Sequence, residues 1–202
     1  MPKSPLLAAL LLVAFASVAS AQQPPTTRIR GTIEAVDGAM LSIKSRDGTD
    51  MKVRTTDNVA VFGVAKTDLS EIKPGSYIGV TAMPEPDGTQ KAIAVHIFPE
   101  NQRGAAEGFR PWDLRANSTM TNATVAETVK GTDGQNITVK YKDGEKKVVV
   151  PPGTPIVTFV AGDKSELKPG AKIIIFGAMK KDDGTLEANR VNVGRDGITP
   201  PM

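Results

Sequence analysis

The sequence predicts an all-β fold of two tandem five-stranded barrels, each with one short helical turn, behind a cleavable signal peptide. Three observations carry this prediction: short apolar segments that alternate with polar residues, Asp-Gly turns, and a set of landmarks that recurs about 96 residues later. Alternation with a period of two buries one face of a strand. Asp-Gly supplies the positive φ that a tight turn between antiparallel strands requires.

Residues 1–21 have the composition of a signal peptide. Lys3 precedes an apolar run of about 11 residues, and Ala19-Ser20-Ala21 fits a cleavage site. A helix that spans a bilayer needs roughly 20 apolar residues, so an uncleaved anchor helix is the weaker alternative. We expect an exported protein, periplasmic or secreted, without a transmembrane segment after cleavage. Residues 22–27 are expected to form an extended N-terminal segment.

The composition excludes much of the usual catalytic chemistry. The chain has 25 Lys+Arg, 22 Asp+Glu, one His and no Cys. Without Cys there are no disulfides, thiol nucleophiles or thiolate zinc sites, and one His cannot supply a multi-imidazole metal site. Nearly balanced charge argues against nucleic acid as a partner, because phosphate binding needs clustered Lys and Arg. We therefore predict no cofactor, no metal site and no enzymatic activity.

The first predicted barrel covers residues 28–99. Its strands lie around residues 29–33, 41–43, 51–53, 77–83 and 92–98. Between the third and fourth strands, Asp68-x-x-Glu71 has the spacing of a capping box, and Lys73-Pro74-Gly75 ends the short helical turn. The unit is therefore three strands, a capped turn and two more strands.

The second predicted barrel, residues 123–195, repeats these landmarks. Residues 163–170 match residues 68–75 at six of eight positions, and the three Asp-Gly pairs of the first unit recur 96 residues on. Landmarks in the same order at a near-constant offset indicate duplication. Residues 196–202 are expected to form a C-terminal tail.

Five antiparallel strands with a small helix after the third are typical of an OB-like barrel, with a plain sandwich as the alternative. The landmarks from Gly31 to Ala92 and their second set resemble the bacterial domain-of-unknown-function family 5666. This resemblance implies small exported OB-like barrels, often in tandem, and implies no function. The second copy departs from the pattern where Glu127 stands in place of Gly31.

Residues 100–122 form the predicted linker, which is longer than most connections and therefore a place to look for function. It holds the only Trp of the chain, and aromatic residues beside arginine are common at recognition surfaces. The candidate binding residues are Phe109, Arg110, Trp112, Asp113 and Arg115. In the alternative, Trp112 only fills the junction between the barrels and its charged neighbours form local salt bridges.

The sequence favours a non-enzymatic binding or adaptor protein whose partner, an envelope protein, lies at the inter-barrel groove and linker. The alternative is a protein that binds a small ligand or a hard cation such as calcium through Asp113, Glu107 and Glu100. An enzyme that cleaves glycans with two carboxylates is a third hypothesis. His96, alone on a strand, is expected to be a surface or hydrogen-bonded residue.

Overall fold

A computed structural model describes residues 26–131 and 134–202. The predicted signal peptide, residues 1–21, lies outside the described residues, and residues 26 and 27 of the expected extended segment begin the first strand. The described chain is all-β, as predicted, with three short 3-10 turns. The strands are β1 (Thr26–Asp37), β2 (Met40–Ser45), β3 (Asp50–Lys66), β4 (Tyr77–Pro84), β5 (Gln90–Ile97), β6 (Gly108–Pro111), β7 (Thr119–Gly131), β8 (Gly134–Tyr141), β9 (Gly144–Val150), β10 (Ile156–Ala161), β11 (Lys172–Lys180) and β12 (Leu186–Gly194).

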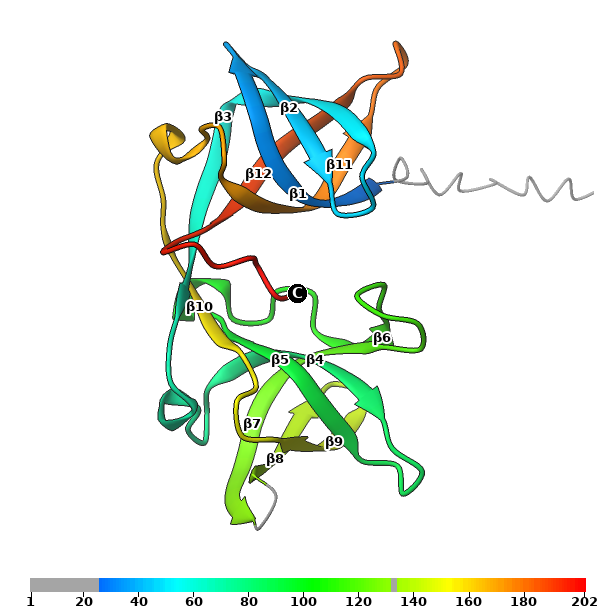
Figure 1. Cartoon of the computed structure of the whole chain (residues 1–202). Coiled ribbons are helices and arrows are strands. Elements are labelled where there is room, and N and C mark those ends of the chain that lie inside the picture. Colours follow the sequence, from blue (N-terminus) through cyan, green and yellow to red (C-terminus); the bar gives the residue numbers. More distant parts are fainter. Residues whose placement is uncertain (1–25, 132–133) are drawn as a thin grey trace, which may run out of the picture.

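The first barrel is a closed ring of five strands taken from both halves of the chain. β2 pairs with β1 and β3, β11 pairs with β1 and β12, and β12 closes the ring by pairing in parallel with β3. Figure 1 shows the blue and cyan N-terminal strands beside the orange and red C-terminal ones. A closed ring leaves no free sheet edge.

Five of the remaining strands form a second ring, which we call the second barrel. β4 pairs with β5 and β7, β8 lies between β7 and β9, and a short parallel contact of β5 with β9 closes the ring. These pairings correct the expected partition, in which residues 28–99 and residues 123–195 each closed one barrel. Each half instead contributes its first three strands to one ring and its last two to the other.

The length of β3 explains how the two halves of the chain exchange strands between the barrels. β3 runs unbroken for 17 residues, so its last part leaves the first barrel and pairs with β10 over residues 62–66. β10 in turn lies parallel to β5 of the second barrel. β3 and β10 therefore form the antiparallel connection on the left of Figure 1, and each half of the chain passes along it from one barrel to the other.

Three apolar clusters hold these parts together. One fills the first barrel with buried Ile, Val, Leu and Ala side chains, and a second fills the second barrel in the same way. The third lies between the barrels and comprises Val64, Met120, Val157, Phe159, Ile174 and Met202. Met202 is fully buried, so the predicted tail, residues 196–202, packs between the barrels, where Figure 1 marks the C-terminus.

Two of the predicted Asp-Gly turns and one of the two predicted capping boxes form with their expected hydrogen bonds. In the Asp-Gly-Thr turns at Asp87 and Asp183, each carboxylate accepts hydrogen bonds from the backbone N–H and the hydroxyl of the Thr two residues on. The capping box forms only in the second half, between Asp163 and Glu166; the first half has no side-chain cap. Glu166 also forms an ion pair with Arg195, at 2.8 Å. The first half has no equivalent of this arginine, because Pro99 occupies the position 96 residues earlier.

The predicted linker, residues 100–122, contains regular secondary structure. It contains η2 (Glu100–Gln102) and β6, and its last residues begin β7, with which β6 pairs. Ser118 fixes the turn between β6 and β7, because its hydroxyl donates to the carbonyl oxygens of Trp112 and Arg115. The residues described contain no helix of the length and apolarity that a membrane crossing requires.

Candidate functional site

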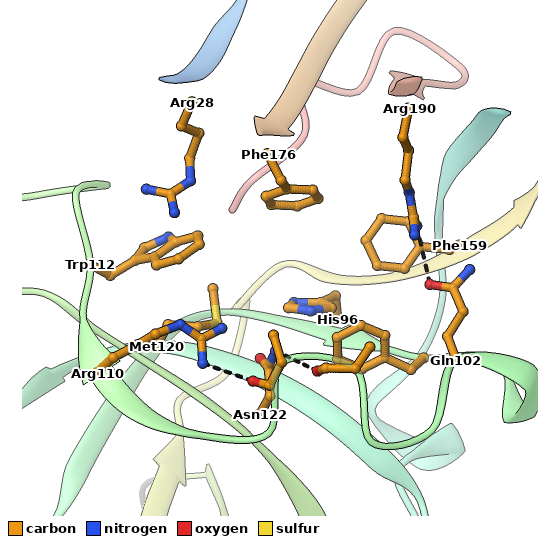
Figure 2. Close-up of a pocket in the computed structure, with 13 residues that line it drawn as sticks. Arg28, His96, Gln102, Arg110, Trp112, Met120, Asn122, Phe159, Phe176 and Arg190 are labelled. Atoms are coloured by element: carbon orange, nitrogen blue, oxygen red, sulfur yellow. Dashed lines mark hydrogen bonds between the residues drawn. The ribbon is translucent and has the colours of Figure 1, made fainter. Parts of the chain in front are cut away.

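A pocket of about 320 Å³ lies between the two barrels (Figure 2). Side chains reach it from β1, β11 and β12 of the first barrel and from β5 and β7 of the second, with others from β6, β10 and the segment between η2 and β6. The lining residues are Arg28, His96, Phe98, Gln102, Ala105, Ala106, Arg110, Trp112, Met120, Asn122, Phe159, Phe176 and Arg190. The pocket therefore exists only because the two barrels are held side by side.

Two residues that line this pocket, His96 and Asn122, lie in one row across the second barrel with Gly79 between them. Gly79 on β4 lies directly opposite His96 on β5 and Asn122 on β7. A Cβ atom on Gly79 would overlap the imidazole of His96 and lie 2.7 Å from the Oδ1 atom of Asn122. The glycine thus makes room for the ring, which is a usual reason for glycine inside a strand.

His96 is buried, with 3% of its surface exposed, and is surrounded by aromatic rings and cations. Its ring centre lies 4.5 Å from that of Phe98 and 5.5 Å from that of Phe159. Burial, together with the charges of Arg110 and Arg190, lowers the pKa of His96 to about 3. The imidazole is therefore neutral near pH 7, and its Nδ1 atom has no hydrogen-bond partner among the described residues.

On one side of the pocket, Arg28 stacks on Trp112. The guanidinium carbon lies 3.6 Å from the ring centre, a cation–π arrangement, and the pair is labelled in Figure 2. Asp113 holds Arg28 at 2.7 Å and Arg30 at 2.8 Å. Burial opposes ionisation of Asp113, but the hydrogen bonds and charges of Arg30 and Arg28 outweigh it and lower the pKa of that carboxyl.

On the other sides lie Arg110 and Arg190, which have no ion-pair partner in the part of the chain that the structure describes. Arg110 donates only to the Ala106 carbonyl, and Arg190 donates to the amide oxygens of Asn192 and Gln102. Burial lowers the pKa of both guanidinium groups, and the charge of Arg28 adds to this at Arg110. Both remain cations, partly buried and not neutralised.

Most of the buried side-chain atoms that lack a hydrogen-bond partner among the described residues belong to side chains that line the pocket. Six buried side-chain nitrogen or oxygen atoms of the described residues lack a hydrogen-bond partner, and all but the Thr121 hydroxyl belong to residues that line this pocket. They are Arg28 Nε, His96 Nδ1, Gln102 Nε2, Trp112 Nε1 and Asn122 Oδ1. Such atoms are rare in folded proteins and each one calls for a partner such as water or a ligand.

Of the five predicted site residues, the structure brings Arg110 and Trp112 into the pocket. Asp113 lies behind it and positions Arg28. Phe109 is 39% exposed and lies under the ammonium group of Lys146, and Arg115 is exposed; neither lines the pocket. The alternation of side chains along β6 explains this result, since Phe109 and Arg110 face opposite sides. The alternative of purely local salt bridges is also wrong for Asp113, whose partners lie on β1.

Sequence reasoning missed most of the pocket. His96 was expected at the surface or in a hydrogen bond, but it is buried and its Nδ1 atom is unpaired. Gly79 inside an apolar strand was the available signal for a close approach. Arg28 and Arg190 carry no local signal, because the exchange of strands brings them here from opposite ends of the chain.

The carboxylates considered for a hard cation do not converge. Glu100 pairs with Arg103, Glu107 accepts from the backbone N–H of Lys142, and Asp113 pairs with Arg28 and Arg30. No group of three His, Asp or Glu side chains in the described part of the chain is placed to hold a metal ion. The pocket itself is lined by cations, which repel another cation.

Comparison with family models, with curated proteins and with solved structures finds no match to this chain. The resemblance to family 5666 therefore stays a prediction.

Proposed function

We propose that the protein binds a small molecule in the pocket between its two barrels. The observation that carries this proposal is the concentration of five unpaired buried polar atoms on residues that line one cavity. Each such atom costs about 1–3 kcal/mol when nothing satisfies it. A volume near 320 Å³ is at the lower end of the range of ligand pockets, roughly 300–1,000 Å³, and fits a metabolite-sized molecule.

We propose binding without catalysis, in agreement with the sequence. The residues around the pocket include no Ser, Thr, Tyr, Lys, Asp or Glu. General acid–base and nucleophilic mechanisms draw mainly on such groups and on histidine. The one candidate, His96, has no carboxylate beside it to orient it or stabilise its charged form.

The setting of this function is also a proposal. The signal-peptide pattern of residues 1–21 supports export to the periplasm or beyond the cell. The recurrence of three strands, a 3-10 turn and two strands in both halves, with β10 added before the turn of the second half, supports the duplication of one OB-like unit. An exported protein with a pocket between its two barrels suits the capture of a ligand outside the cytoplasm.

A pocket-filling variant tests the proposed function. Ala105 is exposed and lines the pocket, so Ala105→Trp narrows it without disturbing a core. Ala39→Trp, in the exposed turn between β1 and β2, is the matched control. In a thermal-shift screen of cell extract and a metabolite library, we expect a compound that stabilises the wild type and Ala39→Trp but not Ala105→Trp. If no compound separates the two variants, the pocket is not a ligand site.

The adaptor role predicted from the sequence is the second candidate, and one observation favours it. Phe109 is a large apolar side chain with 39% of its surface exposed. Phe109→Ala should weaken capture of an envelope protein in a pull-down and leave the melting temperature unchanged. Unchanged capture by this variant would leave Phe109 with no role in recognition.

A further inference from the structure

The charges around the pocket restrict what it can bind. Three guanidinium groups, those of Arg28, Arg110 and Arg190, line it and no carboxylate does. Asp113 lies outside the pocket and is shared between Arg28 and Arg30, so it offsets only part of this charge. Partly buried cations without a counter-ion are unfavourable, and an anion in the pocket would remove that cost.

The unpaired atoms restrict the ligand further. Arg28 Nε, Trp112 Nε1 and Gln102 Nε2 are hydrogen-bond donors, and only Asn122 Oδ1 is an obligate acceptor in the assigned orientation. A neutral imidazole can donate or accept. The residues that line the pocket therefore leave more donors than acceptors unpaired, and the oxygen atoms of a ligand would supply the missing acceptors.

The rest of the wall is apolar and largely aromatic. Figure 2 shows Trp112 and Phe159 on opposite sides of the space, with Phe176 between them and Met120 below. Phe98 adds a further ring beside His96. Flat apolar walls favour a planar ring that stacks on them or meets them edge-on.

Together these features define the ligand class, and the inference rests on the proposed function. We infer that the pocket binds a small aromatic carboxylate, with its ring among Trp112, Phe159 and Phe176 and its carboxylate paired with Arg110 or Arg190, which lie on opposite sides of the space (Figure 2). The planar fork of arginine matches a carboxylate. A phosphate is the less suitable anion, because no helix N-terminus or glycine-rich loop lines the pocket to donate backbone N–H groups.

Calorimetry with matched probes tests the inference on the unaltered protein. The probes are 2-naphthoate, its neutral amide 2-naphthamide, 2-naphthyl phosphate and acetate. We expect 2-naphthoate to bind at least tenfold more tightly than each of the other three, because only it combines the ring with a planar oxyanion. Equal or tighter binding of the amide overturns the anion requirement, and tighter binding of the phosphate ester overturns the choice of carboxylate.

Variants then locate the carboxylate. Removal of the arginine that pairs with the carboxylate, by Arg110→Gln or Arg190→Gln, should weaken 2-naphthoate binding about tenfold or more, whereas Lys91→Gln, an exposed charge on β5, should have no effect. Circular dichroism checks that each variant is folded. If all four probes fail to bind while Ala105→Trp still abolishes a thermal shift from extract, the ligand class is wrong and the proposed function stands. If neither experiment finds a ligand, both fall.

Discussion

At the scale of single residues, Gly79 creates the space that His96 occupies. The second half of the chain gives the natural comparison, because Ile174 lies opposite Asn192 at the corresponding positions of the first barrel. There the isoleucine fills the interface cluster and the amide of Asn192 donates to the Ile174 carbonyl. The position of His96 in the pocket wall therefore follows from one side chain that is missing from one half.

Replacing this glycine should close the pocket. In Gly79→Ala the new methyl group overlaps His96 and approaches Asn122, so we expect the free energy of unfolding to fall by about 1–3 kcal/mol and ligand binding to be lost. Gly177→Ala is the control, because its Cβ would lie 3.6 Å from the nearest atom, an ordinary contact with Thr26. Urea denaturation measures the free energy of unfolding of both variants. Equal stability of the two variants contradicts the role given to Gly79.

The buried imidazole also makes stability depend on pH. The unfolded chain protonates its histidine near the ordinary pKa of 6.5, whereas burial and two arginines lower the pKa of His96 in the folded protein to about 3. Between these values the unfolded state binds more protons, so stability is greatest above pH 6.5 and falls as the pH is lowered.

We expect the free energy of unfolding to fall by an amount that approaches about 1.4 kcal/mol for each pH unit below pH 6.5. Urea denaturation of the ligand-free protein between pH 7 and 5 measures it. Since the chain has a single His, His96→Gln should abolish the slope in this range, where the carboxylates have yet to titrate. The same slope in the variant would assign the effect to other groups.

At the scale of elements, the turn between β6 and β7 positions Trp112. Ser118 is buried and its hydroxyl donates to two carbonyl oxygens, while the backbone N–H of Trp112 donates to the Ser118 carbonyl at 2.7 Å. Ser118→Ala should lower the free energy of unfolding by about 1–2 kcal/mol and shift the Trp112 fluorescence to longer wavelength. Ser70→Ala, exposed on η1, is the control; identical spectra for the two variants contradict this role.

The elements that could be predicted from the sequence are those fixed by nearby residues. Residues 77–83 were predicted as a strand and form β4 almost within those bounds. The Asp-Gly-Thr turns are likewise local, since each carboxylate binds groups two residues away. The capping box was predicted twice and forms once, in the second half, where Arg195, remote in the chain, also binds Glu166.

At the scale of the whole molecule, the exchange of strands could not be predicted. Both halves carry the same alternation of apolar and polar residues, so a strand of either half satisfies the same core, and the pattern does not say which partner it takes. The difference lies in β3, which continues straight beyond the first barrel instead of turning back. The pocket could not be predicted for the same reason, since its arginines come from strands of different halves.

A single disulfide tests the exchange. Thr32 on β1 lies directly opposite Lys172 on β11, a separation that a disulfide can bridge, and the chain has no cysteine of its own. Thr32→Cys with Lys172→Cys should form an intramolecular bond on oxidation, seen as faster migration on a non-reducing gel. The single variant Thr32→Cys is the control. Failure of the double variant to cross-link, with both thiols still reactive, contradicts the pairing of β1 with β11.

The most direct test of the account is a crystal structure of the protein grown with 2-naphthoate. We expect the two barrels with exchanged strands, the ring of the ligand between Trp112 and Phe159, and its carboxylate within hydrogen-bonding distance of Arg110 or Arg190. A ligand bound elsewhere, or a pocket filled by the protein's own side chains, would contradict the account.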